Sequence, residues 1–65
     1  MMKKLNSKHF PHVGMHNLVF KLKDGTVLCG RYDFNSEMAR RFISEDGKEY
    51  TSDCIKEWGW KLNTN

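Results

Sequence analysis

Two Asp-Gly dipeptides, Asp24-Gly25 and Asp46-Gly47, constrain what this chain can fold into more than any other feature. Each lies between two runs of residues. These runs either alternate between apolar and polar residues or are rich in side chains that favour β-strands. An Asp-Gly dipeptide between such runs is the strongest short-range signal for a β-hairpin. We therefore expect two successive hairpins and a short closing strand. The expected strands cover residues 17–23, 26–34, 40–44, 48–52 and 58–62.

The loop length of the first hairpin decides which residues face the core. A two-residue loop at Asp24-Gly25 would turn Arg31 and Asp33 inward, whereas a three-residue loop pairs Leu22 with Thr26 and turns both charges outward. Because burying unpaired charges costs several kcal/mol, we expect the three-residue loop. One face then carries Leu18, Phe20, Leu22, Leu28, Tyr32 and Phe34.

The second hairpin leaves two registers open. A three-residue loop over residues 45–47 pairs Phe42 with Tyr50, and a two-residue loop pairs Ile43 with Tyr50. Both are compatible with the residues on either side of the turn.

With 65 residues, of which 12% are aromatic, the chain is long enough for one small domain. We expect an all-β fold, a curved meander or small barrel of four to five antiparallel strands. Residues 17–62 would form this domain. Residues 1–16, which carry lysines and three histidines without any periodicity, would be a flexible basic tail, and residues 63–65 a frayed end.

Several short runs resemble known small β-barrels. The stretch 22–30, Leu-Lys-Asp-Gly-Thr-Val-Leu-Cys-Gly, resembles the first core hairpin of Sm-like barrels, and an SH3-like barrel describes the pattern equally well. The runs 18–25, 47–50 and 53–55 are also similar to the Rho-binding antiterminator family, whose members are Sm-like. The resemblance covers roughly residues 17–58. It implies the fold more than RNA binding, since residues 55–57 replace the Arg-Gly of the second Sm motif.

The net charge of +3 matches the three lysines Lys3, Lys4 and Lys8 of the tail, because the remaining residues carry as many acids as bases. A basic balance is typical of nucleic-acid binders. An alternative function is therefore binding of RNA or another single-stranded nucleic acid. The residues for it would be Lys3, Lys4, Lys8, Arg31, Arg40 and Arg41.

No residue pattern points to catalysis, to a cofactor or to a strong metal site. The spacing of His9, His12 and His16 is the most metal-like feature, and Cys29 and Cys54 could complete such a site only from separate elements. We expect no catalytic residues, no cofactor and no metal.

The favoured function is a non-enzymatic adaptor or regulator that acts by protein–protein contact. Trp58 and Trp60 alternate on one face, where they either close the core or, if exposed, anchor a partner. The expected contact residues are Trp58, Trp60, Phe34 and Arg31. We expect a cytoplasmic location with reduced cysteines and no membrane segment, and the sequence leaves a homodimer open.

Overall fold

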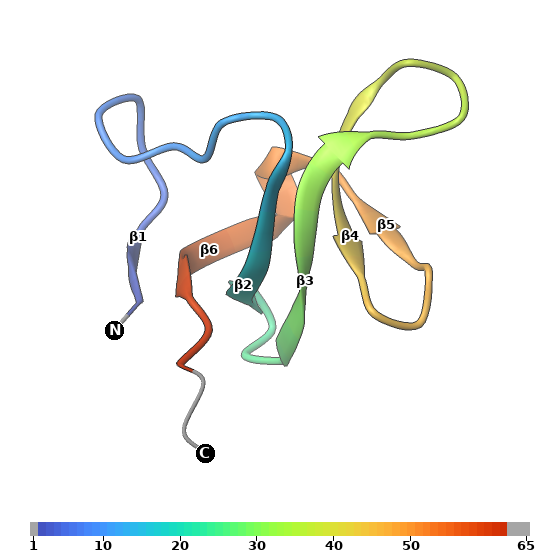
Figure 1. Cartoon of the computed structure of the whole chain (residues 1–65). Helices are drawn as coiled ribbons and strands as arrows, with labels where there is room; N and C mark the ends of the chain where they lie inside the picture. The colour runs from blue at the N-terminus through green and yellow to red at the C-terminus, as the bar shows by residue number, and fades with distance from the viewer. Residues whose placement is uncertain (1, 63–65) are drawn as a thin grey trace.

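The computed structural model describes residues 2–62, which form one sheet of six antiparallel strands (Figure 1). The strands are β1 (Lys3–Lys4), β2 (Met15–Leu22), β3 (Val27–Phe34), β4 (Arg40–Ser44), β5 (Glu49–Tyr50) and β6 (Ile55–Trp60). A 3₁₀ turn, η1 (Ser52–Cys54), joins β5 to β6. The expected all-β class is confirmed. Within residues 2–62, no helix is long and apolar enough to cross a membrane.

The strands lie in the order β1-β6-β2-β3-β4-β5. β2 to β5 follow one another as a meander, and β6 then returns to pair with β2, which places Trp58 opposite Phe20. The sheet has one more strand than the four to five expected, and it does not close between β1 and β5.

The first hairpin has the expected three-residue loop. The amide of Leu22 donates to the carbonyl oxygen of Thr26 at 2.8 Å, and the amide of Gly25 donates to that of Leu22 at 2.9 Å. Gly25 has φ +96°, a conformation that is free of steric cost only for glycine. The register therefore turns Arg31 away from the core, where it is exposed.

The second hairpin uses the same loop. The amide of Ser44 donates to the carbonyl oxygen of Lys48 at 2.8 Å, and the amide of Gly47 donates to the carbonyl oxygen of Ser44 at 2.9 Å. Phe42 therefore lies opposite Tyr50, which selects the three-residue register from the two that the sequence leaves open.

The β3–β4 connection repeats this pattern without a glycine. The amide of Asn35 donates to Ala39 at 2.8 Å, and the amide of Met38 donates to Asn35 at 3.0 Å. Met38 takes the left-handed position with φ 63°. All three hairpins of the meander thus bend at a residue with positive φ.

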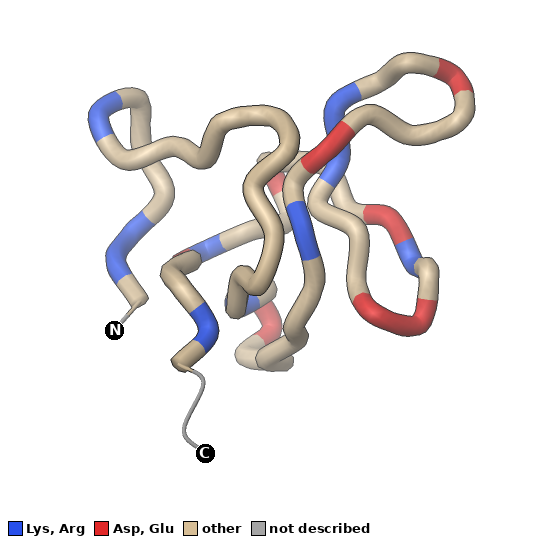
Figure 2. Tube along the Cα trace, viewed as in Figure 1, with Lys and Arg blue, Asp and Glu red and all other residues tan. Residues whose placement is uncertain are grey.

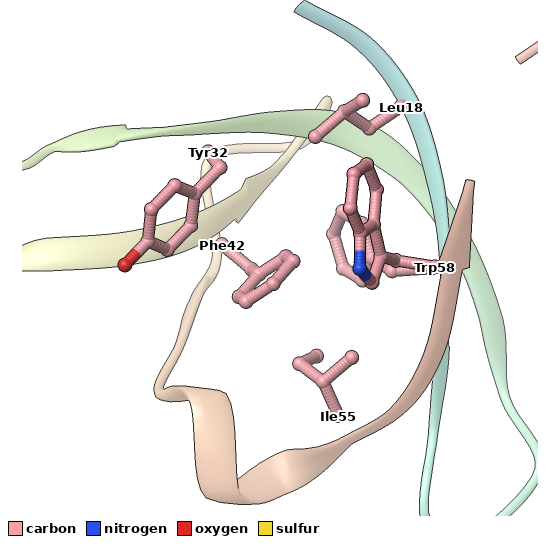
Figure 3. Close-up of a cluster of buried hydrophobic side chains, with 6 residues drawn as sticks. Leu18, Tyr32, Phe42, Ile55 and Trp58 are labelled. Carbon is pink, nitrogen blue, oxygen red and sulfur yellow. The ribbon is translucent and has the colours of Figure 1, made fainter. Parts of the chain in front are cut away.

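The core lies on the face that the first hairpin predicts (Figure 3). Phe42 is central, with its ring centroid 4.8 Å from that of Tyr32 and 5.4 Å from that of Phe20. Burying each such side chain contributes about 1.5–3 kcal/mol. Of the six residues expected on this face, Leu18, Phe20 and Tyr32 are buried, Leu22 and Leu28 are half-buried, and Phe34 is exposed at the end of β3.

Gly30 allows β3 and β4 to approach closely. A Cβ atom at this position would lie 1.9 Å from the carbonyl oxygen of Ile43, which is backbone and cannot move aside. Only glycine fits here, as at other sites where two backbones approach closely.

Residues 2–14, which we call the N-terminal arm, do not behave as the expected flexible tail. Lys3 and Lys4 form β1 on the free edge of β6, and the amide of Leu5 donates to Lys56 at 3.0 Å. The arm lacks periodicity because its order comes from pairing with a strand at the other end of the chain. The expected frayed end, residues 63–65, lies outside the described residues.

Candidate functional site

The arm is held on the sheet by a clasp between His9 and Trp58. Their rings stack with centroids 4.4 Å apart and an angle of 13° between planes. The indole Nε1 of Trp58 donates to the carbonyl oxygen of His9 at 3.1 Å. The side chain of Asn6 shapes the turn before the clasp by accepting from the amides of Lys8 and His9 at 2.8 and 3.0 Å. The clasp therefore fixes where the following residues lie.

After the clasp, the arm runs past the ends of β3 and β4 and encloses a groove with them. The amide of Gly14 donates to Tyr32 at 2.8 Å, which anchors the far end of the arm to β3. The groove has a volume of about 380 Å³. Its lining residues, which we call the aromatic groove, are Phe10, Pro11, His12, Val13, Tyr32 and Arg40.

Phe10 forms the inner wall of the aromatic groove. Its ring meets Tyr32 edge-on, with centroids 5.6 Å apart, and it also lies 6.4 Å from Phe42 in the core. Phe10 nevertheless remains 38% exposed and Val13 36% exposed. Two apolar side chains of the arm are therefore partly exposed to solvent beside the core.

Arg40 brings a positive charge to the rim of the aromatic groove. It lies opposite Phe34 in the β3–β4 register, and its guanidinium carbon is 6.0 Å from the centre of the Phe34 ring. Phe34 is 39% exposed. Among these lining residues, all within the described range, none is acidic. The exposed lining of the groove therefore combines apolar side chains of the arm with polar groups and the cationic Arg40.

The structure separates the four residues expected to contact a partner. Trp58 is 4% exposed and belongs to the core, whereas Trp60 is 56% exposed at the last position of β6. Phe34 does not line the aromatic groove, but it lies beside Arg40, which does. Arg31 lies three positions before Phe34 on β3 and therefore projects from the opposite face of the sheet.

The residues of the nucleic-acid alternative do not form one surface. Lys3 and Lys4 are on β1, at one edge, and three strands separate them from Arg40 and Arg41 on β4. Arg40 and Arg41 also face opposite sides of the sheet, and Arg41 is paired with Asp33 in the register. Lys8 lies in the turn of the arm, and Lys and Arg are spread along the chain (Figure 2).

The histidines and cysteines do not converge. His9 stacks on Trp58, Cys29 is half-buried on β3, and Cys54 is exposed in η1, both cysteines being free thiols. Within residues 2–62, no three His, Cys, Asp or Glu side chains are grouped as metal ligands.

Three carboxyl groups titrate below their ordinary range, and all three belong to turns. Hydrogen bonds from Thr26 lower the pKa of Asp24, chiefly the one from its amide. The Ser44 hydroxyl lowers the pKa of Asp46, and the Thr51 hydroxyl lowers that of Asp53. These bonds stabilise the turns and do not prepare a carboxyl group for acid–base chemistry, which requires a pKa near neutrality.

Sequence reasoning missed the arm's contribution to the site. Phe10, Pro11 and Val13 belong to the segment without periodicity, so no pattern assigned them to a surface. The one available signal is composition, because residues 10–13 place Phe10, Pro11 and Val13 close together in a segment expected to be a flexible tail.

No protein-family model, curated protein or solved structure matches the chain.

Proposed function

We propose that this protein is a non-enzymatic binding module that holds a protein partner in the aromatic groove and acts as an adaptor or regulator. The observation that carries the proposal is the groove itself, in which the arm presents the exposed apolar side chains Phe10 and Val13 beside Arg40 of β4.

The chemistry of the groove suits a protein segment. Aromatic side chains and arginine are enriched at protein contact sites. Aromatic residues and arginine supply most of the energy in such contacts. An extended segment would place an apolar side chain against Phe10 and Val13 and a polar group near Arg40.

The proposal includes a fold of the small-barrel kind, Sm-like or SH3-like, and a cytoplasmic location. The order β6-β2-β3-β4-β5, with η1 before the returning strand, supports a strongly curved sheet. The two free thiols are typical of a reducing compartment.

Nucleic acid is the second candidate occupant, favoured by one observation. Arg40 over Phe34 combines a cation with an aromatic face, as single-strand binders do. The spread of the remaining basic residues counts against it, because nucleic-acid affinity depends on several phosphate contacts acting together.

Photo-crosslinking in cells tests the proposal. A benzophenone amino acid in place of Val13 samples the aromatic groove, and the same amino acid in place of Val27, 50% exposed on β3 outside the groove, is the matched control. We expect a defined protein adduct from position 13 that the control lacks and that Phe34→Ala with Arg40→Gln abolishes. An RNA adduct would support the second candidate, and identical adducts from both positions would overturn the groove as the site.

A further inference from the structure

A second, smaller hollow lies outside the aromatic groove, at the start of β2 and beside β3. Its volume is about 170 Å³, below the 300–1,000 Å³ of sites for drug-sized ligands. The residues that line it, here called the basic hollow, are His16, Asn17, Gly30, Arg31, Glu45 and Lys61.

An irregularity in β2 forms the basic hollow. The register with β3 shifts between Met15 and Leu18, and Asn17 has the left-handed φ of 57°. The carbonyl oxygen of Asn17 accepts a hydrogen bond from the amide of Lys61 at 2.7 Å. This bond ties the segment after β6 beside β2 and brings Lys61 to the same hollow as Arg31 on β3.

The charges around the basic hollow are not balanced. Arg31 and Lys61 are both cationic at neutral pH, and Glu45 is the one acid among the six lining residues. The carboxylate of Glu45 lies 3.5 Å from the ammonium of Lys61, and the Glu45 side chain is 69% exposed. An exposed pair of this kind is weak. No other ion pair forms in the described part of the chain, so Arg31 has no acidic partner there.

We propose that the basic hollow binds one phosphate dianion, either inorganic phosphate or the phosphate of a phosphomonoester. The guanidinium of Arg31 offers a planar pair of donors that matches two phosphate oxygens. The ammonium of Lys61 contributes a second charge, and the imidazole of His16 can donate from another side. Glu45 competes with the anion for Lys61 and moves into solvent when the anion binds. This inference is independent of the aromatic groove.

Titration of the full chain with inorganic phosphate at constant ionic strength, followed by NMR, tests the proposal. We expect the largest shifts at the amides of Arg31, Glu45 and Lys61. Arg31→Gln should weaken phosphate binding about tenfold, the effect of losing a hydrogen bond to a charged group. Lys8→Gln removes the same charge from the arm and should leave the affinity unchanged.

The sharpest test uses a substitution that should increase the affinity for phosphate instead of lowering it. Glu45→Gln removes the competing acid and should tighten phosphate binding about two- to fivefold, as expected from an exposed ion pair. Glu37→Gln changes the net charge equally from the β3–β4 loop and should have no effect. Equal gains in both variants, or shifts that do not localise to the basic hollow, would overturn the site.

Two further probes identify the source of the phosphate group. Free phosphoserine, a monoester, should compete with inorganic phosphate for the same amides. A short thymidine oligonucleotide carries phosphodiesters with one charge each and should compete poorly. Tighter binding of the oligonucleotide at these amides would refute the dianion assignment and point to nucleic acid.

Discussion

Met38 occupies a backbone position that the other two hairpins give to glycine. Its φ of 63° is left-handed, and its side chain is 72% exposed, so that it gains little packing in return. For residues other than glycine this conformation costs roughly 1–2 kcal/mol. Met38→Gly should therefore stabilise the fold by about 0.5–1 kcal/mol after the extra entropy of glycine in the unfolded chain.

Urea denaturation measures this gain as a higher midpoint at constant slope. Met38→Ala is the matched control, because alanine removes the same side chain without relieving the backbone. An equal gain from alanine would show that the methionine side chain, and not the φ angle, is responsible.

Gly30 is the residue whose substitution should be most damaging. A methyl group there would lie 1.9 Å from the Ile43 carbonyl oxygen, so β3 and β4 must separate to admit it. Gly30→Ala should destabilise the fold by at least about 1–3 kcal/mol, as overpacking does. Thermal unfolding by circular dichroism checks this, and a melting temperature equal to that of the wild type would contradict the close approach.

The turn carboxylates predict the response to acid. The pKa values of Asp24, Asp46 and Asp53 are lowered from an ordinary 3.8 by the hydrogen bonds they accept. A group with a lowered pKa in the folded state stabilises the fold above its unfolded pKa, and this contribution disappears as the pH falls through the folded value. Stability should therefore drop below about pH 4.

Replacing all three with asparagine keeps an acceptor at each turn and removes the titration. The free energy of unfolding of this variant, measured in urea from pH 6 to pH 2, should fall less steeply on acidification than that of the wild type. An unchanged slope below about pH 4 would mean that other carboxyl groups govern acid unfolding.

At the scale of elements, the arm is the segment that the fewest contacts hold to the sheet. β1 has two residues and pairs with β6 alone. Its position depends on the clasp between His9 and Trp58. His9→Ala should therefore release the arm locally without unfolding the meander, because local openings follow such weakly packed units.

Amide hydrogen exchange distinguishes local from global release. In His9→Ala, exchange at Leu5 and Gly14 should accelerate at least about tenfold, whereas Phe42 in β4 should keep its protection. His12→Ala, also in the arm but not stacked on Trp58, is the control. Equal acceleration at Phe42 would show that the clasp supports the whole fold.

At the scale of the molecule, both sheet edges are poor templates for another chain. β1 and β5 have two residues each, and β1 carries Lys3 and Lys4. Short edges with lysine discourage strand addition. The sequence leaves a homodimer open, and from these edges we expect a monomer.

Analytical ultracentrifugation should give a monomer mass that does not change with concentration. Lys3→Val together with Lys4→Val makes the edge strand β1 apolar and should induce association, whereas Lys8→Val in the turn of the arm should not. A wild-type melting temperature that rises with concentration would contradict the monomer.

The local chemistry of the sequence determined the meander. Asp-Gly turns require a left-handed residue at a fixed place, and the cost of burying Arg31 and Asp33 chose between the registers of the first hairpin, so loop length and the core face followed from neighbouring residues. The second register stayed open because either pairing placed an apolar residue opposite Tyr50.

Only the tertiary structure determined the position of the arm, which of the two tryptophans is buried, and which residues form each candidate site. Trp58 and Trp60 share one face, but Trp58 lies opposite Phe20 beneath His9, while Trp60 lies at the end of β6. The contacts of the clasp join residues 49 positions apart. Contacts over such separations leave no period in the sequence, because they arise when β6 returns to β2 and offers its free edge to the arm.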